Sequence, residues 1–404
     1  MAIQTLRGMK DIWADDARIF NYIVQNASKI AQKYGFGFIK TPLLEETTLF
    51  KRSVGDSSDI VNKEMYQFID KGGNDVCLRP EGTAGVVRSF IQNKLDRAGG
   101  NHKFYYFGSM FRYERPQKGR LREFNQFGCE SFGSSSVYED ASIILMISEI
   151  LNFFEIKFEL QLNSLGCDNC MPTYKQNLIN NLEQISNDLC EDCQKRIKTN
   201  PIRVLDCKID SCKDLTKFSP KITDNLCQDC DKDFEELKKI LKYNGLDFVV
   251  NKNLVRGLDY YTKSAFEFVS CEIGSQSAIA GGGRYDKLVE FLGGKSTPAV
   301  GFAIGIERIL ELVKIKEESS DIVFVGTTTK DALDLIFKLG IKKRKTIKTH
   351  IEQQNRSFVK LLDIATKVRA TQIAIVGQNE FESGKIWIKN MLTQEEKIIN
   401  IEEF

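Results

Sequence analysis

The sequence predicts an α+β fold in which helices flank an antiparallel sheet, with a cysteine-rich helical segment inserted and a small α/β domain following. Three observations lead to this prediction. Residues 102–116 and 121–133 alternate aromatic with other residues, as the two strands of a hairpin do. Residues 166–241 shift in composition to Cys, Asp, Lys and Asn. Residues 319–404 carry the mixture of strand and helix signals that is typical of a small α/β domain.

Length and composition indicate a multidomain protein. The chain has 404 residues, 42% of them hydrophobic, which is enough for two or three domains. Its formal charge is only +2, so a polyanion would have to be bound by local clusters of charge. No stretch reaches the roughly 18 apolar residues of a membrane span. The N-terminus has no apolar run of signal length, and we therefore expect a cytoplasmic protein.

The elements before the insertion follow in order from the N-terminus. Apolar residues at helical spacing predict a helix over 14–34, and Pro42 lies inside the extended segment after it. The aromatic hairpin comes next, with charged residues at its bend. An apolar run predicts a helix over 141–154, and 157–164 is typical of a further strand. The change of composition that marks the insertion comes directly after this strand.

Strand signals resume after the insertion. They cover 247–270 and 279–285, and a glycine-rich stretch from residue 299 then leads into a helix that carries Glu307 and Arg308. The terminal domain has strand signals over 321–326, 371–377 and 385–391 and helix signals over 331–340 and 358–370. The predicted domains are 1–318 for the sheet domain, 166–241 for the insertion within it and 319–404 for the terminal domain.

Eight of the eleven cysteines lie in the insertion, mostly as Cys-x2-Cys pairs. This spacing is typical of tetrahedral zinc sites, and eight thiolates suffice for two such sites. Disulfides are not expected in the cytosol, so the alternative to metal ligands is that the cysteines are inert thiols. The candidate metal ligands are Cys167, Cys170, Cys190, Cys193, Cys207, Cys212, Cys227 and Cys230.

Three segments resemble the signature motifs of class II aminoacyl-tRNA synthetases. Residues 34–45 (YGFGFIKTPLLE) resemble the first motif, whose proline is Pro42 here and which builds the dimer interface in that class. Residues 110–124 (MFRYERPQKGRLREF) resemble the second motif, and residues 299–310 (AVGFAIGIERIL) resemble the third. The resemblance implies a homodimer that binds ATP with Mg²⁺.

Four further segments are similar to the histidyl branch of this class. They are RGMKDI at 7–12, LRPEGTAG at 78–85, RGLDYYTKSAFEF at 256–268 and GGGRYDKLV at 281–289. The resemblance implies that L-histidine is activated with ATP to histidyl-adenylate and pyrophosphate. It also implies that histidine is then transferred to the 3′ end of tRNA(His).

The motifs imply roles for individual residues. Arg112 and Arg256 are expected to meet the charge that develops on the α-phosphate. Glu130 and Tyr261 are directed at the imidazole ring by the same resemblance, although paired tyrosines are often only core aromatics. The implied histidine contacts are Glu81, Gly82, Thr83, Arg112, Gln126, Glu130, Arg256, Tyr260, Tyr261 and Tyr285. The implied ATP contacts are Arg112, Glu114 for the adenine amino group, Arg120, Phe124 for stacking on adenine, and Arg308 for the γ-phosphate.

The terminal domain resembles an anticodon-binding domain, although residues 342–357 depart from the expected pattern. Six cations and no acid occur over 338–348, which fits contact with phosphate or a solvated face. Two other functions are considered: a synthetase-like regulatory subunit of histidine biosynthesis that charges no tRNA, and a zinc-ribbon nucleic-acid-binding module. Arg112, Arg256 and Arg308 argue against the first, and the ordered motifs outside the cysteine cluster argue against the second.

Overall fold

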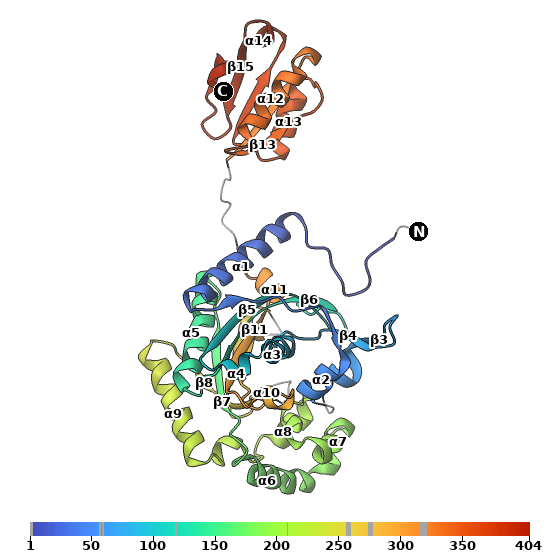
Figure 1. Ribbon diagram of the computed structural model, residues 1–404, viewed down its shortest axis with the longest axis vertical. Helices are drawn as coiled ribbons and strands as arrows, with labels where there is room; N and C mark the ends of the chain where they lie inside the picture. The colour runs from blue at the N-terminus through green and yellow to red at the C-terminus, as the bar shows by residue number, and fades with distance from the viewer. Residues whose placement is uncertain are drawn as a thin grey trace. The chain divides into compact units, whose positions relative to one another are not determined.

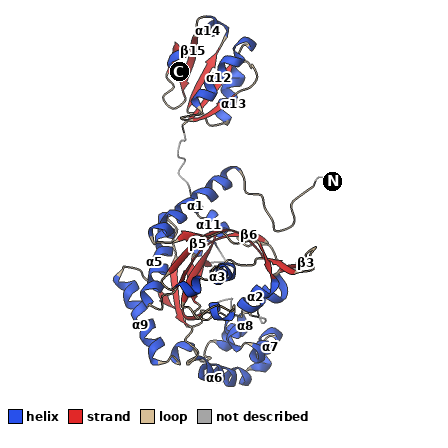
Figure 2. Ribbon diagram, viewed as in Figure 1, coloured by secondary structure: helices blue, strands red, loops and turns tan. Residues whose placement is uncertain are grey.

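The computed structural model describes most of the chain, namely residues 3–55, 58, 60–117, 119–207, 209–255, 260–273, 278–314 and 321–404. The chain forms two compact units, Met1–Lys314 and Ile315–Phe404. Helices and strands are mixed in both of them (Figure 2). Within the described ranges, no helix is both long and apolar enough to cross a membrane.

An eight-stranded sheet forms the centre of the larger unit, in the order β1-β5-β6-β11-β10-β9-β7-β8 (Figure 1). Neighbouring strands are antiparallel except for the two outermost pairs, which are parallel. The predicted antiparallel sheet is therefore confirmed, and the aromatic hairpin forms β5 and β6. The strands are β1 Gly37–Phe38, β5 His102–Phe111, β6 Glu123–Phe132, β7 Glu159–Ser164, β8 Val249–Val250, β9 Thr262–Val269, β10 Ala278–Arg284 and β11 Ala299–Gly305.

Helices cover both faces of this sheet. On one face α1 (Ala14–Lys33) packs against β5 and β6 and beside α5 (Val137–Phe153), and Gln32 Nε2 of α1 donates to the Tyr105 hydroxyl at 3.0 Å. On the other face lies α3 (Thr83–Gln92), where the Phe90 ring stacks on Phe132 at 4.4 Å. Successive residues of a strand point to opposite faces of the sheet. The side chains of the hairpin therefore face the two helix layers alternately.

A smaller sheet and short helices border α3. The sheet has the antiparallel order β2-β4-β3, and its strands pair as β2 with β4 and β3 with β4. These elements are β2 Leu44–Glu46, α2 Thr47–Val54, β3 Tyr66–Ile69, β4 Asp75–Leu78, α4 Leu95–Ala98 and α10 Leu288–Phe291. The chain from β4 enters α3 directly, so residues 79–82 are held between the small sheet and the face of the large one.

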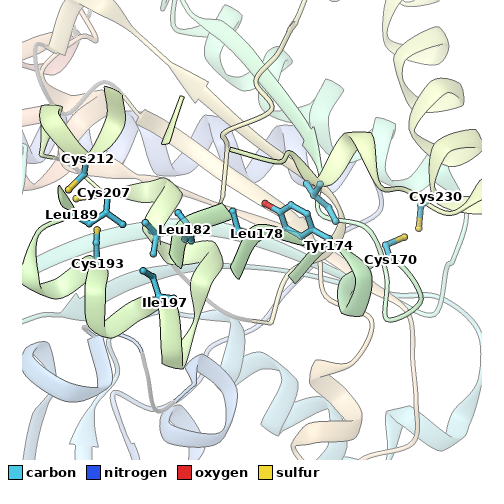
Figure 3. Packing of buried hydrophobic residues seen from close by; sticks show 12 residues of the cluster. Cys170, Tyr174, Leu178, Leu182, Leu189, Cys193, Ile197, Cys207, Cys212 and Cys230 are labelled. Carbon is cyan, nitrogen blue, oxygen red and sulfur yellow. The ribbon is translucent and has the colours of Figure 1, made fainter. Parts of the chain in front are cut away.

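The cysteine-rich segment is helical, as predicted, and follows β7. Its helices surround a narrow apolar core of its own, in which Tyr174, Leu178 and Leu182 lie between groups of cysteines (Figure 3). The last helix also packs against α5 and so returns the chain to the sheet. The helices are α6 Met171–Gln184, α7 Glu191–Thr199, α8 Asp210–Thr216 and α9 Gln228–Tyr243.

The smaller unit is a five-stranded sheet in the order β13-β12-β14-β15-β16 with helices on both faces. Alternate residues of β12 divide between two cores: Val323 and Val325 face the core containing α12, and Ile322 and Phe324 face the core containing α13. The elements are β12 Ile322–Thr327, α12 Leu333–Lys343, β13 Lys348–Ile351, α13 Phe358–Lys367, β14 Gln372–Val376, α14 Gln378–Glu382, β15 Lys385–Asn390 and β16 Glu396–Asn400.

Several predicted boundaries differ from the structure. Helix α5 begins at Val137 rather than at residue 141, because the Ser136 hydroxyl caps it by accepting from Tyr138 N at 3.3 Å. Helix α11 spans only Ile306–Leu310, so the predicted helix from residue 306 onward is shorter than its apolar spacing suggests. Strand β13 was not predicted at all; it begins at Lys348, the last residue of the basic stretch of the terminal domain.

Candidate active site

On the face of the large sheet beneath α3, β11 presents the small residues Gly301, Ala303 and Gly305. On β6, Gln126 and Glu130 lie directly opposite Gly305 and Gly301 of β11. Directly opposite residues of an antiparallel pair share a face, so long side chains on β6 stand beside bare backbone on β11. A Cβ atom at Gly301 would collide with the Glu130 carboxylate. The glycine at position 301 therefore makes room for the Glu130 carboxylate against β11.

Glu130 is the most deeply buried acid of this face, with 0% of its surface exposed. Three hydroxyl groups donate to its carboxylate: Thr83 at 2.7 Å, Tyr106 at 3.2 Å and Tyr285 through a short hydrogen bond. Burial raises the pKa of Glu130 to about 8, although the hydroxyl donors oppose this shift. Glu130 is thus a buried carboxyl group, lined by hydroxyl donors, whose pKa lies above its usual range.

Glu81 holds the beginning of α3 in place above Glu130. One carboxylate oxygen accepts from Thr83 N at 2.6 Å and the other from Ala84 N at 2.9 Å, which satisfies two free amides of the first helical turn. The residue is 3% exposed, and burial raises its pKa. A Cβ at Gly82 would overlap the Tyr106 ring, so this close approach requires glycine. The structure therefore gives Glu81 a helix-capping contact that aims Thr83 at Glu130.

Two polar atoms on this face are buried and lack a hydrogen-bond partner of normal geometry among the described residues. They are the amide oxygen of Gln126 and the hydroxyl oxygen of Tyr260. An unpaired buried polar group costs about 1–3 kcal/mol, so both atoms point to a ligand. The Tyr260 ring lies 4.7 Å from Tyr261 and 5.6 Å from Tyr285, measured between ring centroids. We call Glu81, Thr83, Gln126, Glu130, Tyr260 and Tyr285 the sheet-face pocket.

Arg112 follows β5 on the side of this pocket toward the hairpin bend. Its Nε donates to Pro80 O at 2.9 Å, and its guanidinium lies 5.3 Å from the centroid of the Phe124 ring. Arg112 thereby lies between Pro80, which precedes Glu81, and Phe124, the second residue of β6. A planar cation held on an aromatic ring is suited to contact phosphate or carboxylate with its outer nitrogens.

The other predicted ATP contacts interact with one another at the bend. Glu114 and Arg120 form a short ion pair across the loop. Arg308, from α11, donates to Gly119 O at 3.4 Å and through a short hydrogen bond to Ala278 O. Arg308 of the third motif therefore contacts the bend of the second motif, while Glu114 and Arg120 are paired with each other.

The remaining predicted residues are distributed as follows. Arg256 lies outside the described residues. The eight cysteines form two groups of four, separate from the sheet-face pocket. Tyr261 stands beside Tyr260 at its border.

Four residues that shape the site were given no role by the sequence motifs: Tyr106, Glu307, Asp140 and Arg284. Tyr106 could have been found, because the two-residue period of β5 places it on the same face as Arg112. Glu307 accepts from Asn125 N at 2.8 and 2.9 Å and so fixes α11 to β6. Asp140 and Arg284 form a buried ion pair at 2.7 Å immediately before Tyr285. No local pattern predicts that pair, because its partners are far apart in the chain.

Comparison with known proteins agrees with this arrangement. A family model described as histidyl-tRNA synthetase matches residues 8–170 and 213–309. The histidine–tRNA ligase of Sulfurimonas denitrificans is 59% identical over 402 residues, covering 100% of both chains. That of Campylobacter fetus subsp. fetus is 57% identical over 401 residues, covering 99% of this chain and 98% of the relative. The crystal structure of apo S. aureus histidyl-tRNA synthetase matches with a TM-score of 0.84 at 33% identity, covering 100% of both chains. The chain therefore belongs to the histidyl-tRNA synthetase family.

Proposed function

We propose that this chain is a histidine–tRNA ligase. It activates L-histidine with ATP to histidyl-adenylate and pyrophosphate, and it then transfers histidine to the 3′ end of tRNA(His). The observation that carries this proposal is the sheet-face pocket, in which unpaired polar atoms of Gln126 and Tyr260 lie beside a buried carboxyl group and Arg112. Full-length relatives named histidine–tRNA ligase support it.

In this proposal the pocket binds histidine by its two ends. Glu81, Thr83 and Gln126 receive the α-ammonium group, with the Gln126 amide oxygen, which has no partner among the described residues, as an acceptor. Glu130 and Tyr261 bind the imidazole nitrogens, while Gly82, Tyr260 and Tyr285 shape the pocket around it. A side chain without matching nitrogens would not make the polar contacts that Glu130 and Tyr261 are proposed to supply, which is a basis for rejection.

ATP is proposed to bind beside Arg112, at the hairpin bend. Arg112, with Arg256 as its expected partner, meets the negative charge that grows on the α-phosphate when the histidine carboxylate attacks. Phe124 stacks on adenine, and Arg308 binds the γ-phosphate. For Glu114 to accept from adenine and Arg120 to reach phosphate, the ion pair between them has to open. Mg²⁺ bound with ATP neutralises further phosphate charge.

A homodimer is proposed across the first motif. Beside Pro42, the side chains of Phe38, Leu43 and Leu44 are 51%, 45% and 47% exposed. The Phe38 ring also lies 5.4 Å from that of Phe107, so the apolar surface continues onto the edge of the large sheet. A surface of this kind is favoured as a contact between subunits.

The remaining parts of the chain are assigned supporting roles. Residues 319–404 are proposed to bind the anticodon end of the tRNA, and the clustered cysteines to bind a structural ion that takes no part in the reaction. A cytoplasmic location is part of this proposal. The regulatory-subunit alternative is not favoured, since relatives named as ligases match the chain over their full length.

The test is histidine-dependent exchange of labelled pyrophosphate into ATP by the purified full-length protein. We expect exchange with histidine and not with other amino acids. Arg112→Ala should lower it about 10²–10³-fold, the loss typical of one stabilising donor. Arg115→Ala is the matched control, because Arg115 lies on the same loop and is exposed. A folded protein that binds histidine without any exchange would overturn the ligase proposal in favour of the regulatory one.

A further inference from the structure

The insertion gathers its eight cysteines into two groups of four. The first, here the neck group, contains Cys167, Cys170, Cys227 and Cys230, and the second, the tip group, contains Cys190, Cys193, Cys207 and Cys212. In each group all four sulfur atoms lie within 4.8 Å of one another, and all eight cysteines are free of disulfides. Figure 3 shows members of the two groups at opposite ends of the core that holds Tyr174, Leu178 and Leu182.

The sulfur spacing matches the ligand shell of one tetrahedral metal ion. The Cys167 sulfur lies 3.8 Å from those of Cys170 and Cys227, and the Cys190 sulfur lies 3.9 Å from that of Cys207. Zinc–sulfur bonds of about 2.3 Å in a tetrahedron place the sulfurs about 3.8 Å apart. A disulfide would require about 2.05 Å. A cluster of several irons would spread its four thiolates around more than one metal centre, so the compact groups favour a single ion.

Backbone contacts in both groups favour thiolates. Cys227 N donates to the Cys170 sulfur at 3.2 Å, and Cys190 N donates to the Cys212 sulfur at 3.3 Å. The two groups therefore use the same arrangement, in which the residue just before a helix donates to a sulfur of the same group. Inert thiols have no need of this repeated pattern of amide donors.

Packing gives the same indication, since cysteines make up a large share of the core of the insertion. Five of the twelve buried residues in its core cluster are cysteines that belong to the two groups. Small modules with narrow cores commonly depend on a bound metal or on disulfides for stability. The chain has the thiols for such cross-links, and it arranges them at both ends of the core.

We propose that the neck group and the tip group each bind one Zn²⁺ ion. Thiolate ligands in a tetrahedral S4 arrangement favour zinc among the common divalent ions. All four tip cysteines lie in residues 171–212, outside the segments matched by the family model. This inference concerns the stability of the insertion and does not depend on the proposed ligase activity.

The neck ion also has a position that connects it to the sheet-face pocket. Gly166, next to Cys167, accepts from Lys263 N at 2.7 Å and from the Thr262 hydroxyl at 2.9 Å. On the other side of the group, Asp233 of α9 forms an ion pair with Lys263 at 2.9 Å. Both connections join the strand that begins directly after Tyr260 and Tyr261.

A cavity of about 320 Å³ borders this junction and is lined by Cys167 and Met171 from the insertion and by Tyr260 and Tyr261. The neck ion thus fixes one wall beside the tyrosines. The tip cysteines do not line this cavity, but Asn200, Ile202 and Arg203, from the segment between Cys193 and Cys207, do. Zinc at the neck therefore positions the wall that is joined to the tyrosine strand, and zinc at the tip holds the helices that carry another wall.

The test is the metal content of the full-length protein, purified without added metal and measured by mass spectrometry of the elements. We expect two zinc ions per chain. Cys230→Ser and Cys193→Ser should each retain one, while Cys271→Ser, which changes an exposed cysteine outside both groups, should retain two. Cobalt(II) substituted for zinc should give the absorption bands of tetrahedral thiolate coordination.

The zinc content of the unmodified protein tests the proposal even if a variant fails to fold. A folded chain without metal, whose clustered thiols all react freely in the native state, would overturn the proposal. So would disulfides within the groups, or iron in place of zinc. Two zinc ions in a protein without pyrophosphate exchange would uphold this inference while overturning the proposed ligase activity.

Discussion

The sheet-face pocket and the insertion hold their polar side chains in different ways. In the pocket, Glu130 is surrounded by hydroxyl donors, and the eight-stranded sheet and α3 bury it completely. In the insertion, the cysteines lie at the two ends of a core that they share with apolar residues such as Leu178 and Leu182. A hydrogen-bond network is therefore enough to hold buried polar side chains where packing is extensive. In the smaller helical insertion, the proposed zinc ions supply the additional cross-links.

The largest effect is expected from the buried ion pair behind the pocket. Asp140 and Arg284 are both 2% exposed, and Asp140 also accepts from the Ser264 hydroxyl at 2.5 Å. Asp140→Asn would leave the guanidinium buried without its charged partner, so we expect a loss of about 3–5 kcal/mol in the free energy of unfolding. Urea unfolding measures this loss.

The control for this prediction is Asp16→Asn, because Asp16 forms an exposed ion pair with Lys10. An exposed pair contributes about 0–1 kcal/mol. Similar losses in the two variants would show that the pocket is not held by the buried pair.

The second prediction separates the two cysteine groups by their effect on histidine. It rests on the proposed function. Cys230→Ser should raise the KM for histidine in pyrophosphate exchange about tenfold with a smaller change in kcat, because misplacement of a pocket wall weakens binding. Cys193→Ser should raise this KM less, because the tip group borders the cavity through Asn200, Ile202 and Arg203. The neck group is instead joined through Gly166 to the strand that follows the two tyrosines. Equal effects would contradict a positioning role for the neck.

The third prediction concerns the pH dependence of stability that Glu130 imposes. Burial raises its pKa from 4.5 to about 8 in the folded protein. The folded state therefore keeps a proton that the unfolded state releases, so this contribution to stability is present at low pH and is lost as pH rises through about 8. Glu130→Gln cannot ionise, and the variant should lack this decline, which is at most about 1.4 kcal/mol per pH unit.

Urea midpoints at pH 6.5 and 8.5 test this prediction. Glu183→Gln, which alters an exposed acid in the insertion, controls for the loss of one charge. If Glu130→Gln declined with pH as much as the unmodified protein does, the carboxyl group would already be ionised at neutral pH.

Local patterns were sufficient for those parts of the fold in which each strand or helix carries its own signal. The alternation of β5 and β6 predicted their pairing, because the period of two fixes which residues share a face. Strand β13 gave no such signal: Lys348 and His350 interrupt it, and its stability comes from parallel pairing with β12 and burial of Ile351. Helix α11 ends at Leu310, although apolar residues at helical spacing continue to Val313.

The same distinction applies to the sites. The motif residues Glu81, Thr83 and Glu130 were named from the sequence, and the structure brings them together. Cysteine spacing indicated metal ligands, but not which pairs combine, since Cys167 and Cys227 meet only when α6 and α9 are folded together. The mutual ion pair of Glu114 and Arg120 was likewise beyond the motif, because a motif describes contacts with a ligand.

The smallest effect is expected in the terminal unit, where polar side chains lie on the surface. Lys342 and Lys345 are exposed within the basic stretch that ends α12. In the double variant Lys342→Gln and Lys345→Gln, we expect the KM for tRNA(His) to rise a few-fold while pyrophosphate exchange is unchanged. Each lost phosphate contact should also flatten the slope of log affinity against log salt by about 0.7 for single-stranded RNA. Lys385→Gln is the control, since Lys385 is exposed on β15 of the same unit. If the salt slope were unchanged, Lys342 and Lys345 would not contact phosphate, and the basic stretch would be a solvated surface.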